Sequence, residues 1–248
     1  MQTPSMERYP QVFAGMVALS LALVGSTFIG ATALRDVKSS NDVMVVTGSA
    51  KRPIRSDYVI WRLSVSSQQP TAQAAYQDLK RQTERVQAYL KENQVPAEAI
   101  TLSAIESYSI PEVAPNGRET GQTLAYRLTQ RFEVRSTEVD RYTTLSQQST
   151  DLINDGINLI SESPQYLYTE LSKLRIEMVA EATKDAKARA EAIAQSAGNQ
   201  VGAVRSAETG VFQITSRNST EVSDYGMYDT SSIEKDITAV VSVTFGIE

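Results

Sequence analysis

The first regularity along the chain is a run of 24 residues, Gln11 to Leu34, that contains no charged side chain. A helix crosses the hydrocarbon core of a bilayer with about 20 predominantly apolar residues. The run therefore predicts one transmembrane helix, and residues 1–34 form the expected N-terminal anchor. Small residues recur at every fourth position of the run, a stripe that lets helix backbones approach closely in lipid. The expected helix-packing positions are Ala14, Ala18, Ala22, Ser26 and Gly30.

The same segment has a second interpretation as a cleaved signal peptide. Ala31-Thr32-Ala33 supplies a small-x-small cleavage site, and cleavage after Ala33 would release the remaining chain. The apolar run is longer than the usual signal core of about 7–15 residues, which favours the anchor. Arg8 precedes the run and Arg35 follows it, so the positive-inside rule does not decide the orientation.

The pattern changes after a polar tether at residues 35–42, and residues 43–248 read as one water-soluble α/β domain. Val43–Thr47 is a short apolar run that predicts a strand ending at Gly48. Val59 to Val65 alternate between apolar and other residues, as expected for a half-buried strand. A helix is expected to begin at Pro70-Thr71 and to end near Asn93. Its expected buried stripe is Ala75, Leu79, Val86 and Leu90.

A hairpin and a second helix follow in the pattern. Alternating residues predict strands over Ile100–Ile110 and Leu124–Val134, joined by a long turn over Pro111–Gly121. A helix is expected from about Thr137, whose hydroxyl is suited to cap it, and a strand over Ile157–Tyr168. The element order is β-α-β-β-α-β, which is that of ferredoxin-like domains.

The remaining pattern extends this core. Residues 169–197 predict a long, alanine-rich helix, with these residues near one face: Leu171, Leu174, Met178, Ala182, Ala186 and Ile193. Asp185–Arg189 and Lys187–Glu191 have the spacing of i,i+4 ion pairs. Gly198 is a suitable helix stop, and strands are expected over residues 201–215 and 237–247. The predicted fold class is α+β: a ferredoxin-like core extended by a long helix and two C-terminal strands, preceded by one transmembrane helix.

Composition removes several kinds of site. The 248 residues include no histidine and no cysteine, so imidazole bases, thiolate nucleophiles, disulfides and Cys/His metal sites are excluded. The net charge is −5, without the basic face that phosphate binding requires. We therefore expect no cofactor, no metal and no nucleic-acid partner.

Several local sequences, taken in order, resemble the SIMPL (DUF541) family of bacterial extracytoplasmic proteins. They are Val45–Gly48, Ile100–Pro111, Tyr126, Gly156–Asn158, Ala182–Gly202 and Val240–Phe245, and together they span about residues 43–248. The chain departs from the family pattern where Gly48-Ser49-Ala50 replaces Gly-Glu-Gly and where Ser56-Asp57 replaces Pro-Asp. A glycine near Lys235 is also missing. These departures concern turns.

The resemblance implies an α/β domain exported to the periplasm. It also implies large homo-oligomeric rings, as in some relatives, and an association with envelope or oxidative stress. The family has no agreed enzymatic activity, so the resemblance transfers no catalytic residues, and we expect none here.

Two local features bear on chemistry. Ser232-Ile233-Glu234-Lys235 fits the S-x-x-K pattern of serine–lysine acylases, but it leads into a strand and lacks the partner motifs. Glu106 interrupts the inward positions of its strand. Either its carboxyl is buried with a raised pKa, which would mark a site, or the strand bends or emerges there; the second interpretation is favoured.

Two surfaces are candidates for subunit or partner contacts. The first is the outward face of one strand, which carries Arg127, Arg131 and Arg135. The alternative interpretation is that these arginines are simply exposed to solvent. The second is the centre of the polar segment Ser216–Asp236, which carries Tyr225, Met227 and Tyr228. The alternative interpretation is that this segment is a mobile loop.

The leading hypothesis is a non-enzymatic, membrane-anchored extracytoplasmic protein that self-assembles, its partners being copies of itself and the membrane. One alternative is a monomeric or dimeric peptide- or ligand-binding module tethered to the membrane. Another is a carboxylate-based hydrolase, whose two carboxyl groups would lie about 5–10 Å apart.

Overall fold

The computed structural model describes residues 13–24, 26–27 and 42–248. The chain is a mixed α+β protein whose contacts divide it into two compact units. Unit 1 takes the described residues up to Ala50 together with Val179–Gly210 and Ala239–Glu248. Unit 2 takes Lys51–Met178 and Val211–Thr238. Each unit is therefore assembled from segments that lie far apart in the sequence.

The sheet of unit 2 is antiparallel and centres on two long strands, β2 (Tyr58–Gln69) and β5 (Glu119–Ser136). The outer side of β5 pairs with β3 (Ile100–Leu102) and β4 (Glu106–Val113). The outer side of β2 pairs with β6 (Leu159–Ser161) and β7 (Gln165–Leu167). With its helices this is the predicted β-α-β-β-α-β order, except that the second and fourth strands are each split in two.

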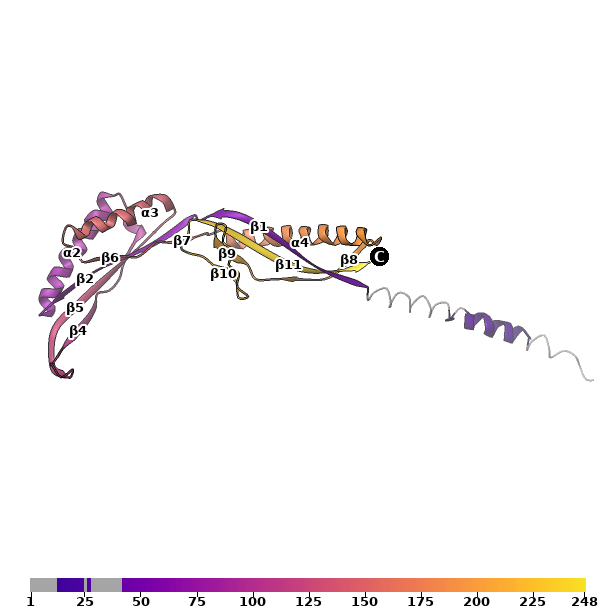
Figure 1. Cartoon of the computed structure of the whole chain (residues 1–248), viewed down its shortest axis with the longest axis horizontal. Helices are drawn as coiled ribbons and strands as arrows, with labels where there is room; N and C mark the ends of the chain where they lie inside the picture. Colours follow the sequence, from indigo (N-terminus) through magenta and orange to yellow (C-terminus); the bar gives the residue numbers. More distant parts are fainter. Residues whose placement is uncertain (1–12, 25, 28–41) are drawn as a thin grey trace, which may run out of the picture. The chain divides into compact units, whose positions relative to one another are not determined.

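Two helices pack on the same face of this sheet, α2 (Ala72–Glu92) and α3 (Val139–Gln148), as Figure 1 shows. α2 begins after Thr71 and ends at Asn93, as the sequence predicted. The structure adds that the Thr71 hydroxyl caps the helix by accepting a hydrogen bond from the Ala74 N–H at 3.2 Å. The predicted stripe of α2 is buried. The core between sheet and helices includes Trp61, Leu63, Leu79, Leu90, Phe132, Val134, Tyr142 and Leu152.

Some predicted boundaries in unit 2 were wrong. The hairpin turn is shorter than predicted, because β4 continues through Pro111 to Val113 and β5 already begins at Glu119. Glu138, not Thr137, is the N-cap of α3, and its side chain makes no capping bond. The Glu138 N–H instead donates to Ser136 Oγ at 3.0 Å, so a serine of the preceding strand fixes the entry to α3.

Unit 1 contains parts of β1 (Val43–Arg55), α4 (Leu171–Ser196) and β11 (Glu234–Ile247), with all of β8 (Val201–Thr209). β11 lies between β1 and β8, and its pairing with β8 is antiparallel. Alternate residues of β11 face inward as predicted. The buried ones in unit 1 are Ala239, Val241, Val243 and Phe245.

Gly48 does not end β1, which corrects the sequence prediction. The strand continues to Arg55, and Gly48 lies directly under α4. A Cβ added at Gly48 would lie 2.2 Å from the Ala182 carbonyl oxygen and 2.4 Å from the Ala186 nitrogen. Glycine is required here because strand and helix backbones approach too closely for any side chain.

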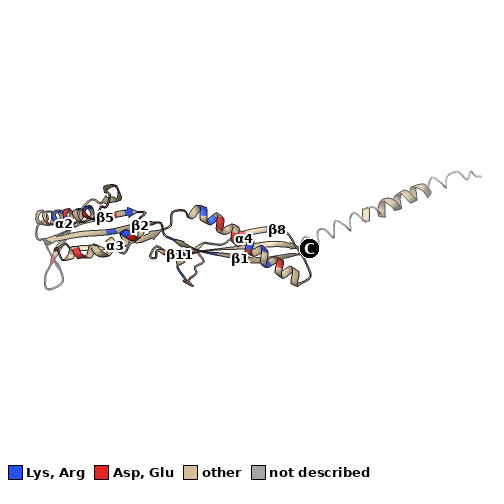
Figure 2. Cartoon of the chain, turned by 90° about the horizontal axis from the view of Figure 1, so that it is seen from above, with Lys and Arg blue, Asp and Glu red and all other residues tan. Residues whose placement is uncertain are grey.

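The inner face of α4 in unit 1 is made of alanines: Ala182, Ala186, Ala190 and Ala194. The two predicted ion pairs are present on the outer surface, Asp185–Arg189 at 2.9 Å and Lys187–Glu191 at 3.6 Å. Figure 2 shows the acidic and basic residues distributed along this helix. Ile193, which was expected on the same face, is 52% exposed near the C-terminal end of the helix.

The predicted strand over residues 201–215 is interrupted after β8, because β9 (Gln213–Ser216) belongs to unit 2 and pairs there with β11. β10 (Met227–Tyr228) adds a short parallel pairing to β9. The segment Ser216–Asp236, for which a mobile loop was one of two interpretations, therefore contains β10 and is hydrogen-bonded to the sheet.

The N-terminal segment is described only in part. Residues 13–24 and 26–27 are helical, and the side chains described there are exposed. Among the residues that the structure describes, no helix combines the length and apolarity needed to cross a bilayer. Gly30, the signal-type site Ala31–Ala33 and the tether up to Asn41 lie outside the described residues.

Candidate functional site

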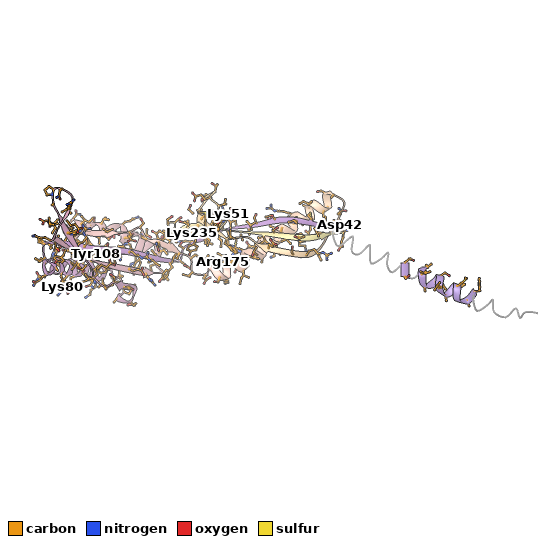
Figure 3. The ribbon with its side chains drawn as sticks, turned by 90° about the horizontal axis from the view of Figure 1, so that it is seen from below. Asp42, Lys51, Lys80, Tyr108, Arg175 and Lys235 are labelled. Carbon is orange, nitrogen blue, oxygen red and sulfur yellow. The ribbon has the colours of Figure 1, made fainter. Side chains whose placement is uncertain are left out.

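Two consecutive charged residues are buried at the start of β11 in unit 2. Lys235 has no exposed surface, and Asp236 is 4% exposed. Fully buried lysine and aspartate are rare unless their charges have partners. The two side chains belong to neighbouring residues of one strand, and they have separate sets of partners. Lys51 and Lys235 are labelled in Figure 3.

The Lys235 amino group contacts three oxygen atoms. It lies 2.9 Å from Ser56 Oγ, between β1 and β2, and 3.1 Å from the Tyr166 carbonyl oxygen of β7. Its third contact is a short one with the Ser232 carbonyl oxygen. Burial lowers the pKa of Lys235, and the negative charge of Asp229 partly opposes that shift.

Asp229 organises the turn that leads into β11. It accepts hydrogen bonds from the Ser231 N–H at 2.8 Å, from the Ser231 hydroxyl and, over a short distance, from the Ser232 hydroxyl. Burial alone would raise the pKa of Asp229, but these hydrogen bonds outweigh it and the pKa is lowered. The turn therefore holds a carboxylate near the buried amine.

Asp236 has its own partners. It forms an ion pair with Lys51 at 3.0 Å, and it accepts the Asn218 N–H at 3.0 Å. Burial opposes ionisation of Asp236, yet these contacts hold its pKa below the ordinary value. Asp236 thus joins β11 to the turn after β9 and to β1.

Two hollows lie near these residues within unit 2. One, of about 380 Å³, is lined by Arg55, Ser56, Thr137, Glu138, Val139, Asp140 and Arg141. The other, of about 330 Å³, is lined mainly by hydroxyl and amide side chains and includes Thr143, Ser146, Gln147, Ser161, Tyr166 and Ser231. Ser56 therefore lies both beside the buried amine and at a surface hollow.

Ser232 and Lys235 of the S-x-x-K pattern both lie in this region, but the Ser232 hydroxyl does not meet the lysine amine. The Ser232 hydroxyl donates to Asp229, and only the Ser232 main-chain carbonyl meets Lys235. The serine hydroxyl next to the amine is that of Ser56, 179 residues earlier in the chain. No local pattern marks Ser56, because its position depends on how β1 and β11 come together.

The three arginines on β5 lie together on the sheet face opposite α2 and α3, and all three are exposed. Arg131 pairs with Glu106, and Arg135 pairs with Glu133, which also accepts from Arg62 at 2.7 Å. The pKa of Glu133 is lowered, mainly by the Arg62 hydrogen bond. Arg127 donates to Gln68 Oε1 at 2.8 Å.

Glu106 is not a buried carboxyl. The strand breaks before it, over residues 103–105, and its side chain is half-exposed and paired with Arg131. The alternative that the strand emerges at Glu106 is thus the one observed, and no functional site arises there.

The three candidate residues of the polar segment have different environments. Tyr225 is 96% exposed, whereas Met227 and Tyr228 form β10. The Tyr228 hydroxyl lies 3.5 Å from the Tyr168 N–H. Tyr225 is therefore the member of the group that presents its whole ring to the surface.

Across residues 13–24, 26–27 and 42–248, no group of three or more acidic side chains is placed to hold a metal ion. The two acidic residues of the 380 Å³ hollow are each paired with arginine, Glu138 with Arg141 and Asp140 with Arg55.

The comparisons with known proteins give a family but little else. No curated protein matches the chain. A putative amidohydrolase/peptidase from Burkholderia cenocepacia is 15% identical, with a TM-score of 0.18, over 53% of this chain and 31% of that one. An uncharacterized conserved protein from Listeria innocua is 10% identical, with a TM-score of 0.18, over 77% and 92%. Likenesses this weak carry no argument about function.

The family comparison identifies the family, because the match covers most of the chain. The profile of SIMPL, "Protein of unknown function (DUF541)", matches residues 44–245, which is nearly the whole chain after the N-terminal segment. The chain therefore belongs to the SIMPL family, whose function is unknown.

Proposed function

We propose that this chain is a membrane-anchored extracytoplasmic protein whose residues 43–248 self-assemble into a large, ring-like homo-oligomer, with a role in envelope or oxidative stress. The observation that carries the self-assembly is strand β8 in unit 1. The other parts of the proposal rest on the N-terminal sequence and on the family resemblance.

β8 is a long edge strand that nothing covers among the described residues. It pairs with β11 along one side only, and seven of its nine residues are exposed. Val204 is an apolar residue with 56% of its surface exposed. Soluble proteins normally protect such edges with lysine, proline or a covering element, since a free edge pairs readily with another strand. Of the protective features, β8 has two charged residues, Arg205 and Glu208, and irregular pairing near Phe245 of β11, but it has neither proline nor lysine.

β1 forms the other edge of the same sheet. Within unit 1 its outward residues include Val43 and Val45, both exposed. One point of this edge is covered, because the Ser49 N–H donates to Asp185 of α4 at 2.8 Å. Two edges on one sheet allow head-to-tail association, which closes into a ring when the rotation between copies permits.

Further contacts in the assembly would come from the arginine face of β5 and from Tyr225. The arginines are already paired within the chain, so they would add polar complementarity at an interface. The fully exposed tyrosine ring is suited to bury area in a contact.

In such an oligomer each copy of the chain would contribute one N-terminal anchor, so the assembly would carry several membrane-binding segments. Apolar side chains of the described N-terminal helix are exposed, including Phe13, Leu19, Leu21 and Val24. A helix with this surface is expected to bury it in lipid or against other helices. Multiple anchors on one oligomer would increase its retention at a membrane through avidity.

The test compares the mass of the full-length protein in detergent with that of residues 35–248 without detergent, by light scattering. We expect a large, uniform mass for both proteins. A large mass for the full-length protein alone would assign assembly to the N-terminal stripe. Two monomers would contradict the proposal.

A matched pair of variants tests the role of β8. Val204→Lys places a charge on the edge strand and should reduce the mass of the soluble form. Ile176→Lys, at an exposed apolar residue of α4, should leave it unchanged. Equal masses for the two variants would exclude the β8 edge as the interface.

The ligand-binding alternative is supported by one observation, the hydroxyl-lined hollow of about 330 Å³ in unit 2. Its volume lies at the lower end for small-molecule sites, which are usually more apolar than this one. A monomeric soluble form would make this alternative the leading one.

A further inference from the structure

Unit 2 places a serine hydroxyl against a completely buried lysine amine, and neither group belongs to the surfaces proposed above for assembly. Ser56 is 3% exposed, and its Oγ lies 2.9 Å from Lys235 Nζ. A general base must lie about 2.6–3.2 Å from the proton that it removes. We propose that Ser56 is a nucleophile activated by Lys235, and that it accepts an acyl or phosphonyl group from a small, activated electrophile.

The contacts of the amine determine how such a pair would work. The Tyr166 and Ser232 carbonyl oxygens can only accept hydrogen bonds, so they use two N–H groups of Lys235. An uncharged amine has two N–H groups and one lone pair. Its lone pair then faces the third neighbour, the Ser56 hydroxyl, whose proton it accepts when the hydroxyl turns from the Ser232 carbonyl, 3.4 Å from Ser56 Oγ.

Burial promotes the uncharged amine that this arrangement needs. The environment of Lys235 lowers its pKa through desolvation, as for lysines that act as bases. Asp229 is the charged group that favours the protonated form, and its own carboxylate is engaged with Ser231 and Ser232. Two main-chain oxygens fix the amine, just as a third group orients the base in a catalytic triad.

Ser56 is held in place and lies at a hollow. Its N–H donates to the Ile233 carbonyl at 2.9 Å, and the next N–H, that of Asp57, donates to Leu167 at 3.0 Å. Ser56 also lines the hollow of about 380 Å³. Arg55 and Arg141 line the same hollow, and each is paired there with a carboxylate, Asp140 and Glu138 respectively, so the lining is polar and balanced in charge.

The reaction balances without a cofactor. Ser56 Oγ forms a bond to the electrophilic carbon or phosphorus while its proton moves to Lys235 Nζ. The bond to the leaving group breaks, and that group departs with the electron pair. For an ester the proton then passes from Lys235 to the departing alkoxide, and water can later hydrolyse the acyl-serine by the reverse proton path. For a fluorophosphonate the leaving group is fluoride, and the phosphonyl-serine persists.

The experiment treats residues 35–248 and the full-length protein with an alkyl fluorophosphonate and measures intact mass with time. We expect one adduct per chain, located on Ser56 by peptide mapping. The rate should rise with pH and level off below the ordinary lysine pKa of 10.5. Mapping is done on the unaltered protein, so the result does not depend on whether a variant folds.

Variants then show whether Lys235 activates Ser56 or whether exposed serines of the protein react with the probe in general. Ser56→Ala should abolish the adduct, and Lys235→Met should slow it by about 100-fold or more, since general bases contribute roughly 10²–10⁴-fold. Ser107→Ala, at an exposed serine of β4, is the matched control and should label at the normal rate.

Three outcomes would overturn the proposal. One is the absence of any adduct on the unaltered protein. Another is an adduct on Ser232, the serine that the S-x-x-K pattern indicates. The third is an adduct on Ser56 whose rate follows hydroxide concentration alone and does not change in Lys235→Met. None of these outcomes affects the mass measurements that test self-assembly, so the two proposals fail independently.

Discussion

Unit 2 buries large side chains between its sheet and two helices, whereas unit 1 brings an alanine face of α4 against the main chain of β1. In unit 2 the fully buried residues include Trp61, Phe132 and Tyr142. In unit 1 the contact depends on the missing side chain of Gly48 and on small residues such as Ala182 and Ala186. One unit is stabilised mainly by the area it buries, and the other by how closely two backbones approach.

The comparison shows that the two units tolerate change differently. A wide core loses stability when a large side chain is shortened, because a cavity remains. A close backbone contact loses stability when a side chain is added, because nothing nearby can move aside. The first two predictions below test this difference, and the third tests the buried carboxylate of unit 2; they run from the largest expected effect to the smallest.

Trp61→Ala should lower the free energy of unfolding of unit 2 by about 3–5 kcal/mol. The indole packs in the core and donates to Ser161 Oγ at 3.0 Å, so both packing and a hydrogen bond are lost. Urea unfolding measures the change. Ile160→Ala, at an exposed residue of β6, is the control and should change stability by less than about 0.5 kcal/mol. Equal effects for the two variants would show that the core is not as described.

Gly48→Ala should destabilise unit 1 by about 1–3 kcal/mol, since the new methyl group would overlap the backbone of α4. The sign is informative, because glycine to alanine at an unstrained site usually stabilises by about 0.4–1 kcal/mol. Hydrogen exchange should show faster exchange in residues 179–196 and no change in α2. Thr47→Ala, the exposed neighbour, serves as control. A stabilised Gly48→Ala protein would contradict the close contact.

Asp236→Asn should lower the free energy of unfolding by about 1 kcal/mol at pH 7. The variant loses the ion pair with Lys51 and weakens the hydrogen bond that the Asn218 N–H donates. The folded-state pKa of Asp236 is lowered, so its contribution is present above the unfolded pKa of about 3.9 and is lost as pH falls through the folded value. The difference between variant and parent should therefore shrink at acid pH in urea unfolding. Glu98→Gln, at an exposed acid, should show no such trend. A difference that stays constant with pH would mean that Asp236 is not ionised when folded.

Local sequence patterns were sufficient for most secondary structure. The alternation in β2 and β11, the capping of α2 by Thr71 and the ion pairs of α4 depend on residues within a few positions of one another. Such short-range preferences act in any fold that the segment joins, so the sequence reveals them. Breaks within strands were missed, because pairing partners determine where a ladder stops.

Only one of the two residues of the candidate site could be found from the sequence. Lys235 belongs to a recognisable local pattern, but its serine partner comes from Ser56 at the far end of the chain. Likewise Gly48 looked like a strand terminator, and only the arrival of α4 shows why a side chain is excluded there.

The sequence by itself determined the order of elements, their inward faces, the absence of imidazole and thiol chemistry, and membership in the SIMPL family. The tertiary structure alone decided that the chain forms two units, each built from segments distant in the sequence, that β8 is left as an uncovered edge, and that Lys235 meets Ser56. The physical reason is range: propensity and periodicity are local, whereas burial, edge exposure and pKa depend on atoms brought together from distant parts of the chain.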